Sequence, residues 1–283
     1  MQPRAARESP RSLGCVTFSK LGHWGQFGNQ LFQISAVLGY AAKYRCRPKL
    51  PLWRCSYSGL NYGDYFPRLS HYYYLGQYDG AVYHEQNFSY NEIPFIYNVD
   101  LRGLFQSEKY FVFIQDKIRG IFKEPEYAEA ILNSYCAEHR LFEFNAIHFR
   151  FYNHPLNDKG HVVEALPDSY FLNALERLGS TRPLVVATDN QASLREFMAR
   201  NRVTQKFYVL MFDHPLLDFF MLTRAERIAI SNSSFSWWAA YLGKKKLEIL
   251  APQRYYWFNS IESRNPFWNT KDLYPEDFKE LIF

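Results

Sequence analysis

The sequence lacks an apolar run of about 18 residues, the length that a helix needs to cross a bilayer. Residues 1–13 are basic and polar without the apolar segment of a signal peptide, so we expect them to form a loose tail. These two absences predict no stable membrane insertion. They also favour a cytoplasmic location, unless a membrane anchor has been removed.

Cysteine and excess charge are also scarce. The four cysteines show neither paired metal-ligand spacing nor the density of a disulfide scaffold. Cys46 and Cys55 could still form one disulfide in an oxidising compartment. The 33 basic and 28 acidic residues give a net charge of +5, and no long basic face is present. This mild excess suits an anionic small molecule and argues against nucleic acid as a partner.

The dinucleotide-binding fingerprint G-x-G-x-x-G is absent as well. The first turn carries its glycines at positions 22, 25 and 28, which is the wrong order for that motif and argues against a nicotinamide-dependent dehydrogenase. Glycines still allow the backbone to approach a ligand closely. Asn29 follows Gly28 at the start of the next helix, and this position suits a site of group transfer.

What is present is an alternation of strands and helices. We predict a strand at 15–19, a helix from about 31 that ends before Pro48, and helices at 107–122 and 126–138, while residues 51–99 stay unassigned. Strands follow at 145–149, 184–187, 207–211, 228–231 and 247–251, with helices at 168–178, 191–200, 216–224 and 235–242. The pattern predicts an α/β protein with a doubly wound parallel sheet. After the tail we expect domains at 14–140 and 141–283.

Three polar segments come directly after strands of the second predicted domain. They contain His148 and Arg150, then Asp189, then Asn232 to Ser234. Ligands of doubly wound sheets bind at the carboxyl ends of the strands, so these segments should face one crevice. Together they describe a pocket for a nucleotide diphosphate. Alternatively, Arg150 forms a surface ion pair, His148 is a satisfied buried histidine, and Asp189 caps the following helix.

Residues 230–242 combine a polar turn with a strongly apolar helical face. Ser233 and Ser234 stand where the first backbone N–H groups of the helix have no intrahelical partner, which favours an anion such as phosphate. The alternative is that Asn232 or Ser233 only caps the helix and that the two tryptophans only fill the core.

Four segments resemble glycosyltransferase family 11, whose known members are largely α-1,2-fucosyltransferases. Residues 25–33 (GQFGNQLFQ) resemble its G-x-x-G-N-Q-x-F-Q turn, and residues 100–111 resemble its mid-chain segment. Residues 148–150 (HFR) resemble the first half of its H-x-R-R-x-D motif, and residues 232–238 (NSSFSWW) resemble N-S-[ST]-F-S-W-W. The resemblance runs from about residue 20 to residue 260.

The resemblance implies a GT-B fold, with two Rossmann-like domains facing a central cleft, and no metal or cofactor. It implies an inverting transfer of fucose from GDP-fucose to a glycan with a terminal galactose-like sugar, at its 2-OH. Arg150, Asn29 and His148 would be catalytic, with Arg150 on the β-phosphate and Asn29 at the reacting sugar. The donor site, which also includes Asn29 and Arg150, would further contain Gly28, Asp189, Asn232, Ser233, Ser234 and Phe235.

The sequence departs from the family pattern at Phe151 and Asn153, where the family has a second arginine and an aspartate. Asn153 cannot take a proton, so a base role of that aspartate is lost or moved, with His154, Asp158 and Glu164 nearby in sequence. One alternative is therefore a catalytically dead glycan- or nucleotide-binding relative. Another is a transferase using another GDP-6-deoxyhexose or a protein acceptor, because acceptor choice lies in the unassigned residues 51–99. Animal members are anchored in the Golgi, so the Golgi lumen is the alternative location.

Overall fold

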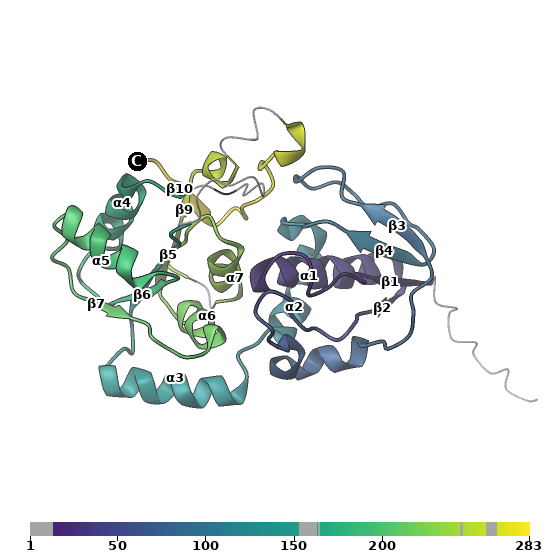
Figure 1. The fold of residues 1–283 in the computed structure, drawn as a ribbon, viewed down its shortest axis with the longest axis horizontal. Helices are drawn as coiled ribbons and strands as arrows, with labels where there is room; N and C mark the ends of the chain where they lie inside the picture. Colours follow the sequence, from purple (N-terminus) through teal and green to yellow (C-terminus); the bar gives the residue numbers. More distant parts are fainter. Residues whose placement is uncertain (1–13, 153–162, 164, 244–245, 259–264) are drawn as a thin grey trace, which may run out of the picture.

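The chain forms two lobes, each built around one parallel sheet (Figure 1). The structure is a computed structural model that describes residues 14–152, 163, 165–243, 246–258 and 265–283. The first lobe contains a four-stranded sheet and the second a six-stranded sheet. The position of a domain boundary at residue 140 stays a prediction.

The first lobe has strand order β2-β1-β4-β3. Its strands are β1 (Cys15–Thr17), β2 (Arg47–Lys49), β3 (Ala81–His84) and β4 (Val99–Arg102). The helix α1 (Phe27–Tyr44) connects β1 to β2, and nearly all of its first fifteen residues are buried. Because β1 and β4 are central neighbours, the segments that follow them leave the sheet at the same edge.

The second lobe has strand order β7-β6-β5-β8-β9-β10, all parallel. Its elements are β5 (Asn145–Phe149), α4 (Asp168–Leu178), β6 (Leu184–Thr188), α5 (Gln191–Arg200), β7 (Phe207–Val209), α6 (Pro215–Thr223), β8 (Arg227–Ala229), α7 (Ser234–Leu242), β9 (Glu248–Pro252) and β10 (Phe278–Leu281). This is the strand order of a dinucleotide-binding sheet, and its order reverses between β5 and β8. Ligands of such sheets bind at that reversal.

Sequence periodicity identifies most of the second lobe but fails at one helix of the first. The predicted helix 107–122 is wrong: it consists of short 3-10 turns at Glu108–Tyr110 and Val112–Ile114, followed by α2 (Gln115–Ile121). Phe111, with φ of −146°, separates the two turns. Its buried ring lies 6.3 Å from Phe32 and is stacked 5.4 Å from Trp238, so tertiary packing overrides local helix propensity. The helix α3 (Glu126–His139) forms as predicted.

Helices α1 and α7 pack directly against each other and join the lobes (Figure 1). Phe32 of α1 lies 4.5 Å from Trp237 and 4.9 Å from Trp238, ring centre to ring centre. Both tryptophans are completely buried, so the prediction that they belong to the core is confirmed. The indole N–H of Trp237 donates to the carbonyl of Leu273 at 2.9 Å, which satisfies its one polar atom.

The four cysteines are free and buried, so the alternative of a disulfide between Cys46 and Cys55 does not hold. No helix within the described ranges has the length and apolar character needed to span a bilayer.

Gly28 provides the close approach between the lobes. A β-carbon at this position would lie 2.4 Å from the carbonyl carbon of Ser234 and 2.6 Å from the backbone nitrogen of Phe235. We predict that Gly28→Ala destabilises the protein by about 1–3 kcal/mol, because rigid backbone must move to admit the methyl group. Urea unfolding measures this effect. The matched control is Gly120→Ala in α2, where the new methyl meets only the end of the Arg68 side chain at 3.1 Å and stability should not fall.

Candidate functional site

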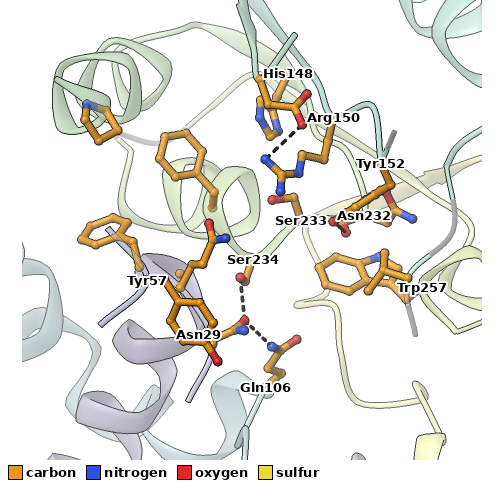
Figure 2. Close-up of a pocket in the computed structure, with 18 of the residues that line it drawn as sticks. Asn29, Tyr57, Gln106, His148, Arg150, Tyr152, Asn232, Ser233, Ser234 and Trp257 are labelled. Carbon is orange, nitrogen blue, oxygen red and sulfur yellow. Dashed lines mark hydrogen bonds and ion pairs between the residues drawn. The ribbon is translucent and has the colours of Figure 1, made fainter. Parts of the chain in front are cut away.

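A cleft of about 760 Å³ lies between the lobes, at the carboxyl ends of the central strands. The first lobe contributes residues 25–29 after β1 and Leu104 and Gln106 after β4. The second lobe contributes residues that follow β5, β6 and β8, together with the first turn of α7. Figure 2 shows Arg150, Asn29, Ser234 and Gln106 around the same cavity. The three polar segments of the second lobe therefore meet in one cleft, as the sequence predicts.

Arg150 is the only arginine or lysine among the described residues that line the cleft. It leaves β5 at the reversal of strand order, and its backbone N–H donates to Ser231 Oγ at 3.1 Å. Ser231 Oγ in turn donates to the carbonyl of His148 at 2.6 Å, which ties the end of β5 to the segment after β8. The guanidinium carbon lies 5.1 Å from the centre of the Tyr152 ring. The arginine is thus fixed by its neighbours on both sides.

Asp189 orients this arginine. Its Oδ2 lies 3.1 Å from Arg150 Nη1, and its Oδ1 accepts from the backbone N–H of Phe151 at 2.9 Å. The alternative that Asp189 caps α5 is wrong, because Asn190 is the N-cap and its side chain accepts from the N–H of Ser193. A ribose or guanine contact by Asp189 stays a prediction, and it would use the lone pairs that these two bonds leave.

The first turn of α7 faces the cleft with Ser233, Ser234 and Phe235. Ser233 is the N-cap residue, yet its side chain makes no capping hydrogen bond. The preceding residue, Asn232, is held by hydrogen bonds to other segments. Tyr152 donates its hydroxyl to the carbonyl of Asn232 at 2.9 Å, and the Asn232 amide donates to the carbonyl of Tyr256 at 3.0 Å. The N-terminal N–H groups and the positive end of the helix dipole are thereby presented to the cavity beside Arg150.

Asn29 connects the two lobes inside the cleft. Its Oδ1 accepts from Gln106 Nε2 and from Ser234 Oγ, each at 2.7 Å (Figure 2). Gly28 also lines the cavity, but the structure gives it a packing role between the lobes as well. The predicted part of Asn29 and Gly28 in donor binding stays a prediction.

The loop that carries Gln106 is held by a buried carboxylate. Glu85 directly follows β3 and is 8% exposed, and its two oxygens accept from the backbone N–H groups of Leu104 at 2.7 Å and Phe105 at 2.9 Å. Burial raises the pKa of Glu85 to about 8, against the opposing effect of the two N–H donors. Sequence reasoning missed Glu85 because nothing local marks it, and missed the role of Gln106 because the residue lies in a segment noted only for its resemblance.

His148 lines the cleft and is 5% exposed. Burial, together with the nearby charge of Arg150, lowers the pKa of its imidazole to about 3. Its ring centre lies 5.5 Å from that of Phe235, and its Nδ1 has no hydrogen-bond partner in the described part of the chain. The ring is therefore neutral at physiological pH, and it could exchange a hydrogen bond with a ligand.

At the position of the second family arginine, Phe151 turns into the lobe and packs on Phe149 and Phe171, with ring centres 5.7 and 6.0 Å away. The candidate residues Asn153, His154, Asp158 and Glu164 lie outside the described residues.

One carboxylate that the sequence analysis did not identify, Asp218 of α6, lines the cleft. Within the described ranges, no group of three or more His, Cys, Asp or Glu side chains is placed to hold a metal ion.

The chain matches the family model described as glycosyl transferase family 11 over residues 71–265. It is similar to a crystal structure of NodZ α-1,6-fucosyltransferase soaked with GDP-fucose, with 14% identity, 86% of this chain and 97% of that chain covered, and a TM-score of 0.52. Fucosyltransferase NodZ from Bradyrhizobium and a NodZ co-crystallized with GDP each give 14% identity, 81% and 93% coverage and a TM-score of 0.50. No curated protein sequence matches. These likenesses establish the fold, and the predicted GT-B class is confirmed.

The first prediction at this site concerns Glu85. Glu85→Gln should lower the free energy of unfolding by about 1–3 kcal/mol, because the amide NH₂ group takes the place of one accepting oxygen and turns a donor toward a buried backbone N–H group. Urea denaturation measures the loss. Glu92→Gln is the control: its carboxylate is 66% exposed in the pair with Lys43, so stability should hardly change. An equal effect of the two substitutions would contradict the bracing role.

The second prediction concerns His148 and acid. A histidine with a pKa of about 3 in the folded state and about 6.5 when unfolded takes up its proton only on unfolding between these values, so stability falls as the pH is lowered. The contribution is about 1.4 kcal/mol per pH unit between pH 6 and pH 4. Unfolding titrations at several pH values should show a shallower acid slope for His148→Gln than for the unsubstituted protein. His71→Gln, at an exposed position, should keep the original slope.

Proposed function

This chain belongs to glycosyl transferase family 11, and from that premise we propose that it transfers L-fucose from GDP-fucose to a hydroxyl group of a sugar. The observation that carries the proposal is the placement of Arg150, the only described cation of the cleft, beside the N-terminus of α7 at the reversal of strand order. A diphosphate needs such an arrangement. The NodZ structures with GDP-fucose and GDP support this choice of donor.

Arg150 is proposed to bind the β-phosphate through its fork of N–H groups, since a guanidinium matches phosphate oxygens in geometry and charge. The pair with Asp189 sets the direction of the fork. The first N–H groups of α7, that of Ser234 included, and the hydroxyl of Ser233 supply further donors to the diphosphate, while the hydroxyl of Ser234 donates to Asn29. Asn29 is fixed through its oxygen by Gln106 and Ser234, so its NH₂ group is left to meet the fucose.

We propose an inverting reaction without a metal. The acceptor oxygen attacks the anomeric carbon while the bond from that carbon to the β-phosphate oxygen breaks and GDP departs with the electron pair. Negative charge grows on the diphosphate, and the guanidinium of Arg150 together with the N-terminus of α7 stabilises it in the transition state. His148, which lines the same cleft, is proposed to act as a neutral hydrogen-bonding group.

The proposed acceptor is the 2-OH of a terminal galactoside, which would give an α-1,2 linkage. This choice rests on the family resemblance, and the NodZ structures carry an α-1,6 description, so linkage has to be measured on the product. The alternative substrates are another GDP-6-deoxyhexose as the donor or a protein as the acceptor.

The prediction is that Arg150→Ala lowers acceptor-dependent release of GDP by about 10²- to 10³-fold, because charge on the leaving group is no longer stabilised. GDP-fucose is supplied with a panel of β-galactosides, and GDP release and product linkage are both followed. Arg195→Ala, on an exposed position of α5, is the control and should transfer at the original rate. Transfer should also persist in EDTA.

Calorimetry of GDP binding separates the alternatives. Binding without transfer to any acceptor would favour a catalytically dead relative or another donor sugar. No binding of GDP at all would contradict the proposed donor class, and loss of transfer in EDTA would contradict the metal-free step.

A further inference from the structure

Asp218 is the second of the two carboxylates among the described residues that line the cleft. It lies one turn into α6 after Pro215, and both residues border the cavity on the same face of the helix. Tyr57 and Tyr62 of the first lobe border the cavity too, and Tyr57 is 60% exposed. A ring of this kind can stack on a sugar. The lining of the cleft thus includes, besides Arg150, two tyrosines and a second carboxylate.

The two carboxylates differ in their surroundings. Asp189 is held by Arg150 and by a backbone N–H. Asp218 Oδ1 is buried, and within the described part of the chain it has no hydrogen-bond partner. A carboxylate oxygen withdrawn from water without a donor is costly, and such groups in native structures call for an explanation. The other oxygen, Oδ2, is not buried in this way, so a donor from a ligand in the cleft can reach the carboxyl group there.

Burial raises the pKa of Asp218 to about 7, well above the usual range of an aspartate. A proton acceptor works best when its pKa lies near the working pH. The other titratable side chains of the cleft fit this task less well, because the pKa of His148 is about 3 and Asp189 is ion-paired. On the far side of α6, Tyr135 of α3 is the ionisable neighbour whose titration senses Asp218.

Resting on the proposed function, we infer that Asp218 is the catalytic base, which accepts the proton of the acceptor hydroxyl. The acceptor O–H bond breaks with its proton passing to an Asp218 carboxylate oxygen, the acceptor oxygen forms the bond to the anomeric carbon, and the bond from that carbon to the β-phosphate oxygen breaks. GDP takes the electron pair, and Asp218 later returns the proton to water. The family motif has an aspartate where this chain has Asn153. In this chain Asp218, which belongs to α6, takes the place of that carboxylate.

The test is Asp218→Asn, which keeps the size of the side chain and removes its ability to take a proton. The kcat of transfer should fall by about 10²- to 10⁴-fold, whereas the Kd of GDP, measured by calorimetry, should stay within about twofold because the diphosphate end of the cleft is unchanged. Asp218→Ala should lose the same activity, and added formate should restore part of it by entering the space left by the carboxylate. A purely structural role would show no such rescue.

Asp213→Asn is the matched control, an exposed aspartate two residues before α6 and outside the cleft lining, and it should transfer at the original rate. The proposal is overturned if Asp218→Asn retains a kcat within about threefold of the original, or if formate rescues nothing in Asp218→Ala. If the unsubstituted protein itself transfers no sugar, the proposed function fails together with this assignment. If the unsubstituted protein transfers sugar and Asp218→Asn still does so, only the assignment of Asp218 as the catalytic base fails.

Discussion

The contact between α1 and α7 is the constraint on which the rest of the molecule depends. The first turns of both helices form the cleft, and their later turns pack Phe32 against Trp237 and Trp238. The same two elements therefore supply ligand-facing atoms and the core that joins the lobes. Any change in the crossing of these helices moves Asn29 relative to Ser234, and the site would change with it.

Positioning of the polar site depends on hydrogen bonds and an ion pair formed within the protein. Asn29 is held from both lobes, and the loop that reaches it from β4 is fixed by the buried carboxylate of Glu85. Arg150 is fixed in the same way by Asp189 and by the Ser231 bond to its backbone. Buried hydrogen bonds of this kind hold a site in a productive geometry before the substrate arrives, which reduces the reorganisation needed at the moment of reaction.

Most of the second lobe and the meeting of its polar segments could be predicted from the sequence, because buried parallel strands there give apolar runs and the strand ends share one edge. The first lobe was harder. Its β2 and β3 are largely exposed or only partly buried, so they give no apolar run in the sequence, and Phe111 interrupts an apparently helical segment to fill the interlobe core. Glu85 and Asp218 escaped for a related reason: each acquires its meaning from burial, which only the folded chain reveals.

The charges of the cleft are divided in a way that suits group transfer. Its single described cation and the N-terminus of α7 lie together, where a leaving diphosphate would gain negative charge. The carboxylate of Asp218 lines the same cavity from α6, and no described cation pairs with it. Arg150 already pairs with Asp189, and a second carboxylate beside it would weaken the hold on phosphate, whereas a cation beside Asp218 would lower the pKa of Asp218 and make it a poorer base. Separation of the two preserves both properties, so the placement of the charges, and not their number, makes the cleft suitable for the proposed reaction.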